Sequence, residues 1–286
     1  MVGDMTYDIT GRGGLNYLSC RYGRSQLQFR GPKRRLDRDH VLFLGGTETY
    51  GRYIVQPMSD LVEAAIGHPC VNLGVPNAGV DAFLNDVTIK DMMSRAQVTV
   101  VQVMGAQNMS NRFYAVHPRR NDRFLNASDL MKRLFRDVDF TEYTFNRHML
   151  LAIRLLSLER YQMIEHELRE AWVARMRSLL QGTTGRKVLL WFARQSPDAS
   201  GAARDDLGPD PLFITRDMIE ALRHHVTEVV EVVVSPLAQA QGTAGMVFDP
   251  LETVSAGSML GPAAHAEAAA ALAPVLKRMF PAHRQG

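Results

Sequence analysis

The stretch VLFLGGTETYG, residues 41–51, decides the fold. It begins with four apolar residues, turns at two glycines and continues into a short polar segment that includes Thr47. A short apolar run that ends at a glycine is typical of a strand buried on both faces of a parallel sheet. The segment therefore predicts a strand, a tight turn and a helix, with Thr47 at the carboxyl end of the strand.

Four more apolar runs repeat this pattern along the chain, at residues 70–74, 98–104, 188–192 and 229–234. Helical patterns lie between and after them, at residues 57–66, 80–94, 145–180, 216–225 and 262–279. Strands that alternate with helices in this way predict a parallel sheet with helices on both faces. The fold class is therefore α/β, a three-layer α/β/α architecture with a five-stranded parallel, flavodoxin-like sheet.

The longest helical region carries a clear apolar stripe. Its members recur three or four residues apart: Tyr161, Ile164, Leu168, Trp172, Met176 and Leu179. This spacing predicts one buried helix face, and Gly182 is the expected end of the helix.

The chain of 286 residues is expected to form a single domain over 1–286, because one core of this size is still common. Residues 1–40 form an N-terminal extension, 109–144 a polar insertion and 196–211 a loop rich in Gly, Pro and Asp. The last two segments follow strands at their carboxyl ends, where open α/β sheets bind ligands. Long loops at that edge favour a functional site.

The composition excludes several classes of protein. The chain shows no export signal and no uncharged apolar run of membrane length, so we expect a cytoplasmic protein without a membrane span. Cys20 and Cys70 are then expected as reduced thiols. No phosphate-binding loop, dinucleotide fingerprint, paired-histidine metal spacing or nucleic-acid module is present, so we expect no cofactor, no metal and no nucleic-acid partner. The sequence leaves the oligomeric state open.

The opening stretch resembles the first block of the SGNH/GDSL hydrolases, in which a buried strand runs into a Gly-Asp-Ser turn. NLGVPNAGV (72–80), VVQVMGAQNMSN (100–111) and SMLGPAAHAEAAAAL (258–272) resemble the later blocks, in the family's order. The resemblance implies an SGNH-like fold and places Thr47 at the nucleophile position. It also implies backbone or amide donors for an oxyanion hole or ligand: Gly46, Gly74, Gln107, Asn108 and Asn111.

The same resemblance shows departures at all three catalytic positions. Thr47 replaces the serine, Ala256 stands at the aspartate and Met259 at the histidine. Methionine cannot accept a proton, and a threonine hydroxyl without a base is a poor nucleophile. A closer resemblance, through GAQNMSNRFYAVHPRRNDRF (105–124), is to an uncharacterised bacterial family, a domain of unknown function, which implies no activity.

Two residues have competing interpretations. Thr47 could act as a nucleophile or bind a ligand, or its hydroxyl could satisfy the turn or cap the following helix. His265 could replace the missing base with Asp249 or Glu252 orienting it, or it could pack in the first turns of its helix. His117 is a second candidate for the base.

Basic residues gather in the insertion. His117 and four arginines could clamp a phosphate, sulfate or carboxylate, because guanidinium groups bind such anions bidentately: Arg112, Arg119, Arg120 and Arg123. Alternatively, Asp122, Asp137 and Asp139 neutralise these arginines within a salt-bridged insertion.

Three functional hypotheses follow. The first is an SGNH-like pseudoenzyme with a degenerate triad that binds a polar or anionic small molecule or a saccharide, with Thr47, Gln107, Asn108 and the arginines lining the mouth. The second is an active esterase or deacetylase with Thr47 as nucleophile and His265 or His117 as base. The third is a regulatory or scaffold protein that meets its partner through the insertion 109–144.

Overall fold

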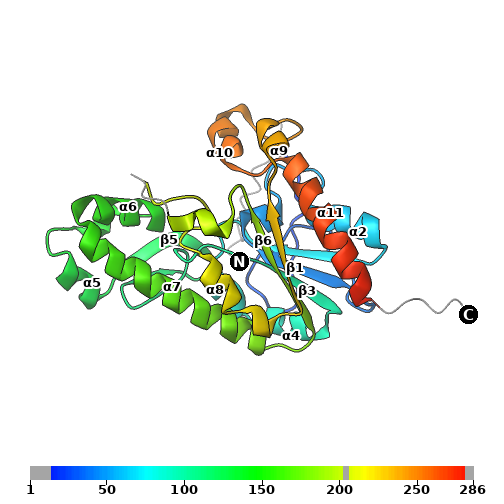
Figure 1. Ribbon diagram of the computed structural model, residues 1–286, viewed down its shortest axis with the longest axis horizontal. Coiled ribbons are helices and arrows are strands. Elements are labelled where there is room, and N and C mark those ends of the chain that lie inside the picture. The colour runs from blue at the N-terminus through cyan, green and yellow to red at the C-terminus, as the bar shows by residue number, and fades with distance from the viewer. Residues whose placement is uncertain (1–13, 202–205, 281–286) are drawn as a thin grey trace, which may run out of the picture.

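The computed structural model describes residues 14–201 and 206–280 of the chain. Its main sheet has five parallel strands in the order β2-β1-β3-β6-β7. The strands are β1 (Val41–Gly45), β2 (Cys70–Gly74), β3 (Val98–Gln102), β6 (Arg186–Ala193) and β7 (Glu228–Val233). This is the flavodoxin-like order, in which the chain begins at an inner strand and winds outward. The predicted α/β fold with a five-stranded parallel sheet is confirmed (Figure 1).

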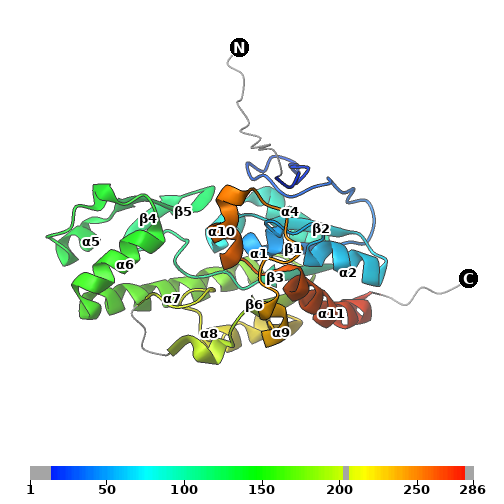
Figure 2. The same ribbon diagram turned by 90° about the horizontal axis from the view of Figure 1, so that it is seen from above.

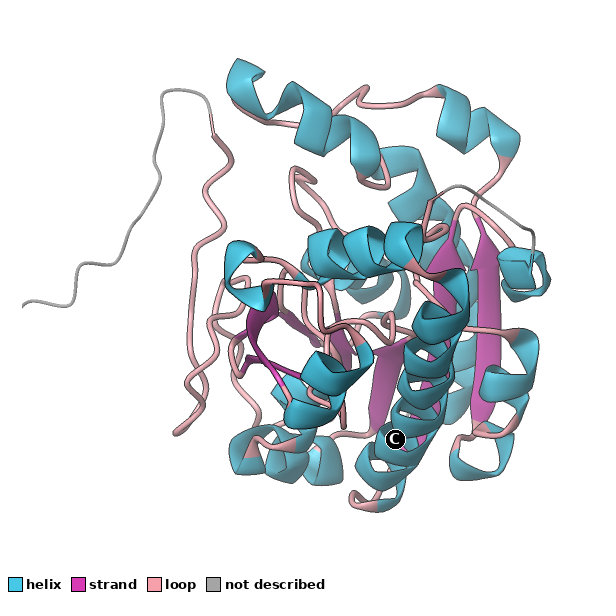
Figure 3. Ribbon diagram, turned by 90° about the vertical axis from the view of Figure 1, so that its left-hand side faces the viewer, coloured by secondary structure: helices cyan, strands magenta, loops and turns pink. Residues whose placement is uncertain are grey.

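The sheet has a hydrophobic cluster on each face, because side chains alternate along a strand. In β1, Leu42 and Leu44 join the larger cluster, whereas Val41 and Phe43 join the smaller one. Helices cover both faces: α2 (Met58–Ile66) and α11 (Pro262–Met279) on the smaller cluster, α3 (Val80–Leu84), α4 (Val87–Arg95) and α7 (Leu158–Gln181) on the larger. Figure 3 shows helices on both sides of the strands, which makes the three layers.

The helices predicted over 80–94 and 145–180 are each divided in two. Asp86 separates α3 from α4, and Ser157 separates α6 (Asn146–Leu156) from α7. Each of these side chains accepts a backbone N–H three residues further on. A new helix starts there because the side chain satisfies an amide that has no partner inside the helix. Each of the two predicted helices is therefore a pair of shorter helices in the structure, α3 with α4 and α6 with α7.

The remaining elements are short. They are α1 (Thr47–Tyr50), η2 (Pro197–Gly201), α8 (Arg216–Glu220), η3 (Arg223–His225), α9 (Pro236–Ala240), η4 (Pro250–Glu252) and α10 (Thr253–Ser258). The insertion folds into an antiparallel pair with two short helices: β4 (Tyr114–His117), β5 (Arg120–Ala127), α5 (Asp129–Leu134) and η1 (Phe140–Glu142). Figure 2 shows it beside α6, at the opposite end of the molecule from α11.

Helix α7 buries the predicted stripe, since all six of its residues lie in the larger cluster. The helix ends at Gly182, as expected. On the other face, α11 begins at Pro262 and ends at Met279, the predicted bounds.

One segment differs from the expectation on membrane spans. Pro250–Met279 is apolar and long enough to cross a bilayer by length and composition alone. In the structure, 56% of its most apolar window is buried, and α11 contributes its inner face to the smaller cluster. A core helix passes the same test of length and composition, so this segment is weak evidence for a membrane.

The N-terminal extension supports the turn after β1. Arg30 is 7% exposed, and its guanidinium donates to the carbonyls of Gly51 over 2.7 Å and Val55 over 2.8 Å. The described part of the extension thus ties the loop behind α1 to the body of the domain.

Cys20 and Cys70 are both free thiols.

Candidate functional site

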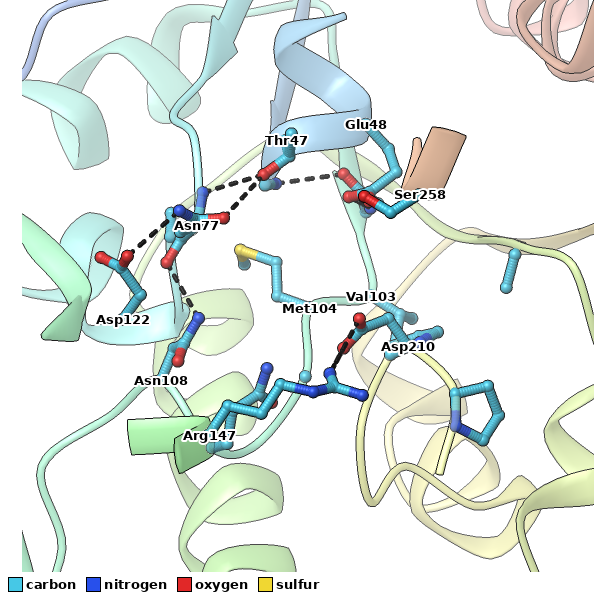
Figure 4. Close-up of a pocket in the computed structure, with 18 of the residues that line it drawn as sticks. Thr47, Glu48, Asn77, Val103, Met104, Asn108, Asp122, Arg147, Asp210 and Ser258 are labelled. Atoms are coloured by element: carbon cyan, nitrogen blue, oxygen red, sulfur yellow. Dashed lines mark hydrogen bonds and ion pairs between the residues drawn. The ribbon is translucent and has the colours of Figure 1, made fainter. Parts of the chain in front are cut away.

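A cavity of about 610 Å³ opens at the carboxyl ends of β1, β3 and β6. Thr47 and Glu48 line it from the turn after β1, and Gln107 and Asn108 line it from the loop after β3. Figure 4 shows that Thr47, Glu48, Asn77 and Asn108 surround a common space. This is the edge at which an open α/β sheet binds its ligands, as the sequence predicts.

Thr47 is 7% exposed and is held by Asn77 on two sides. The Thr47 hydroxyl donates to Asn77 Oδ1 over 3.2 Å and accepts the Asn77 backbone N–H over 3.0 Å. Asn77 Nδ2 donates in turn to Asp122 Oδ2 over 3.2 Å (Figure 4). A carboxamide cannot take up the proton of an attacking hydroxyl. Within residues 14–201 and 206–280, no imidazole or carboxylate forms a hydrogen bond with this hydroxyl.

The backbone donor beside Thr47 comes from Asn77 and not from Gly74. Asn77 has a φ of +57°, a left-handed conformation that asparagine adopts more readily than most residues. The Gly74 N–H instead donates to Asn72 Oδ1 over 2.9 Å, and a Cβ at Gly74 would lie 2.2 Å from the backbone nitrogen of Tyr50. Gly74 therefore permits the close approach of β2 and α1. The backbone N–H expected to face the site from Gly74 is therefore supplied by Asn77 instead.

Glu48 places a carboxylate in the cavity, beside Ser258 in Figure 4. Its Oε2 accepts a hydrogen bond from Gln102 Nε2 over 3.0 Å. The other end of the Gln102 amide is fixed, because Oε1 accepts the N–H of Gly46 over 3.1 Å and the hydroxyl of Thr49 over 2.6 Å. Burial raises the pKa of Glu48, and the hydrogen bond from Gln102 lowers it in part.

The loop after β3 supplies two amides to the wall. Asn108 Nδ2 donates to the carbonyl of Asn77 over 3.0 Å, and Asn108 Oδ1 accepts from Asn146 over 3.2 Å. Gln107 is 8% exposed, and its buried Oε1 has no hydrogen-bond partner among the described residues. The structure thus brings Thr47, Gln107 and Asn108 together, as the sequence predicts.

Among the described residues, the guanidinium groups of Arg147 and Arg194 line the cavity, and both are already paired. Arg147 forms an ion pair with Asp210 over 3.1 Å and donates to the carbonyl of Gly208 over 3.0 Å. Arg194 donates to the carbonyls of Ser258 over 3.1 Å and Met259 over 2.7 Å. Its charge therefore satisfies the carboxyl end of α10.

His265 does not line the cavity. It is 1% exposed, its Nδ1 accepts the backbone N–H of Met58 over 3.1 Å, and its ring packs against Phe192. Burial, with a smaller contribution from the charge of Arg30, lowers the pKa of His265 to about 3. His265 is therefore packed in the core, which was one of its two interpretations. A base would have to reach the Thr47 hydroxyl, and His265 is not in the cavity. Met259, the residue aligned with the family's histidine, does line the cavity.

A family model described as a domain of unknown function, DUF6473, matches residues 5–280. The chain belongs to this family. A search of curated proteins finds no match to this DUF6473 chain.

Solved structures similar to the DUF6473 chain include carbohydrate-active and drug-metabolising enzymes. One is a carbohydrate esterase family 2 enzyme with a carbohydrate-binding domain from Corynascus thermopiles (Myceliophthora fergusii), with 12% identity, 87% of this chain and 68% of that chain covered, and a TM-score of 0.41. Another is a gut microbial diltiazem-metabolizing enzyme, with 12% identity, coverage of 85% and 47%, and a TM-score of 0.41. A Lactobacillus plantarum protein also matches, with 12% identity, coverage of 85% and 98%, and a TM-score of 0.41. These values assign no activity or ligand to this chain.

The insertion of the DUF6473 chain does not bring its basic residues into the cavity. Arg112 pairs with Glu167 on α7, its Nε donating over 2.6 Å, and Arg123 lies over the ring of Phe145. The backbone N–H groups of Arg119 and Arg120 each donate to Nδ1 of His117 over 3.2 Å, which shapes an exposed turn. The expectation that these arginines line the mouth is therefore corrected. The insertion lines the cavity through Asp122.

Asn111 also lies outside the cavity. Its Oδ1 accepts the backbone N–H groups of Phe113 over 2.8 Å and Tyr114 over 3.1 Å, and its Nδ2 donates to the carbonyl of Met109. Asn111 therefore holds the loop, whereas the resemblance had implied a contact with the ligand. In the part of the chain that the structure describes, no three His, Cys, Asp or Glu side chains are grouped as metal ligands.

Proposed function

We propose that this DUF6473 chain is an SGNH-like protein that keeps a ligand cavity without the hydrolytic triad and binds a small polar molecule, specifically a saccharide. The observation that carries the proposal is the environment of Thr47. Its hydroxyl donates to the Asn77 amide oxygen and accepts the Asn77 N–H, and it forms no hydrogen bond with an imidazole or carboxylate base among the described residues. Such a hydroxyl can hydrogen-bond a ligand but lacks the base that acyl transfer requires.

The chemistry of the cavity wall supports a saccharide. Carboxamides and carboxylates offer donors and acceptors for hydroxyl groups, and two phenylalanines, Phe145 and Phe192, add apolar surface. A site with a few placed polar groups among apolar side chains is typical of small-molecule binding. Because Arg147 and Arg194 are already paired, a neutral ligand fits the wall better than an anion does.

One sample can test binding and hydrolysis together. We expect N-acetylglucosamine or glucose to shift the NMR resonances of cavity residues, and we expect no acetate release from acetylated glucose above the spontaneous rate. Thr47→Val keeps the shape of the side chain but removes the hydroxyl. Loss of one hydrogen bond of about 1 kcal/mol should weaken saccharide binding roughly fivefold.

The control is Thr184→Val, at an exposed threonine outside the cavity, which should bind as the wild type does. Two results would contradict the proposal. One is acetate release by the wild type that Thr47→Val abolishes, which would establish the esterase alternative. The other is that neither saccharide binds at any concentration up to about 100 mM, well above the weakest affinities of interest.

A further inference from the structure

The charges that line the cavity are unevenly paired. On the positive side, Arg147 is engaged by Asp210 and Arg194 by the carbonyls at the end of α10. On the negative side, Glu48 accepts from Gln102 Nε2 and from its own backbone N–H, and Asp122 accepts from Asn77 Nδ2, all of them neutral donors. A further lining carboxylate, Asp206, accepts the backbone N–H of Gly208. Neither Glu48 nor Asp122 forms an ion pair within the described residues.

Glu48 is the more confined of the two carboxylates. Glu48 lies in α1, the first turn after β1, and its Oε2 accepts a hydrogen bond from Gln102 Nε2. Burial raises the pKa of Glu48, and the nearby charge of Asp210 raises it more than that of Arg194 lowers it. An ionised carboxylate that is partly removed from water is stabilised when a cation comes within contact distance. Within residues 14–201 and 206–280, no cationic side chain forms an ion pair with Glu48.

Gln107 provides an independent sign that the wall lacks donors. Gln107 lines the same cavity and is 8% exposed. Its Oε1 is buried and has no hydrogen-bond partner among the described residues. A buried acceptor without a donor costs about 1–3 kcal/mol. The unpartnered oxygen of Gln107 therefore favours a ligand that brings N–H or O–H groups to this wall.

We infer that the ligand is an amino sugar, a saccharide whose protonated amine pairs with the Glu48 carboxylate while its hydroxyl groups meet the amides of the wall. This inference rests on the proposed function, because it names the class of saccharide that the cavity takes. An ammonium group carries three donors and one positive charge. An ammonium group can therefore pair with the Glu48 carboxylate and also donate hydrogen bonds to the oxygen atoms of the wall.

Three probes with nearly the same ring test the inference: glucosamine, glucose and N-acetylglucosamine. NMR titration at pH 6.5 keeps the amine of glucosamine protonated. We expect the wild-type protein to bind glucosamine about tenfold more tightly than glucose or N-acetylglucosamine, which corresponds to about 1.4 kcal/mol. In Glu48→Gln, which keeps the shape and can still contact Gln102, this preference should fall to twofold or less.

Glu159→Gln is the matched control, because Glu159 is exposed on α7 outside the cavity, and it should keep the tenfold preference. If all three probes bind with equal affinity, the amino-sugar inference is overturned and saccharide binding stands. A preference that persists in Glu48→Gln would remove Glu48 from the account. If none of the probes binds, the proposed function fails as well.

Discussion

Replacing Trp172 with alanine should lower the free energy of unfolding by about 4 kcal/mol. Trp172 is fully buried in the middle of α7, and its indole Nε1 donates to the carbonyl of Met104 over 2.8 Å. The change would leave a large cavity in the larger cluster and would remove the donor to the carbonyl of Met104, in the loop that follows β3. Urea denaturation followed by circular dichroism measures the loss.

Trp172→Phe separates packing from the hydrogen bond. It keeps most of the ring volume but removes the donor, so we expect a smaller loss of about 1–2 kcal/mol. A loss below about 1 kcal/mol for Trp172→Ala would mean that α7 does not hold the end of β3 in place.

Gly79→Ala should destabilise the fold by about 3 kcal/mol and abolish saccharide binding. A Cβ at Gly79 would lie 1.7 Å from the carbonyl oxygen of Asn108, so the start of α3 and the loop after β3 would have to separate. The Gly79 N–H also donates to Asn121 Oδ1 over 2.9 Å. The separation would move Asn108 out of the cavity wall.

Gly257→Ala is the control for this substitution. A Cβ at Gly257 would meet no atom within 4 Å, and the residue lies in α10. Alanine favours a helix over glycine by up to about 1 kcal/mol, so stability should hold or rise. Equal unfolding midpoints for Gly79→Ala and Gly257→Ala would show that the contact between α3 and the loop is not tight.

The sheet was predictable from the sequence because its strands are buried on both faces. Val41–Gly45 is an unbroken apolar run and Cys70–Gly74 is interrupted only by Asn72, and the bounds of these two strands match to the residue. The helix breaks at Asp86 and Ser157 were missed, because the apolar period continues across them. Each break depends on a single side chain that accepts one backbone N–H, and periodicity does not report such a contact.

The site was predictable only in part. Thr47, Gln107 and Asn108 follow strands directly, so the fold alone brings them to one edge of the sheet. Arg147 and Asp210 come from a helix and a loop far apart in sequence, and their pairing needs coordinates. Asn77 had a local signal, since it follows a proline in a turn where a left-handed residue is common.

His265 and the insertion arginines show the opposite error. A histidine near the expected base and a basic cluster on a long loop both indicate function by residue type. In the structure, a backbone N–H satisfies His265, and Glu167 pairs with Arg112. Residue type identifies groups that can do chemistry, whereas only their neighbours show whether they are already engaged.

The central claim is that, among the residues that the structure describes, no general base forms a hydrogen bond with the Thr47 hydroxyl. A fluorophosphonate probe tests this directly, because it reacts with a hydroxyl that a neighbouring base activates and spares one that no base activates. After incubation, intact-protein mass spectrometry should show no adduct on the wild-type protein. A single adduct that maps to Thr47 and disappears in Thr47→Val would contradict the account.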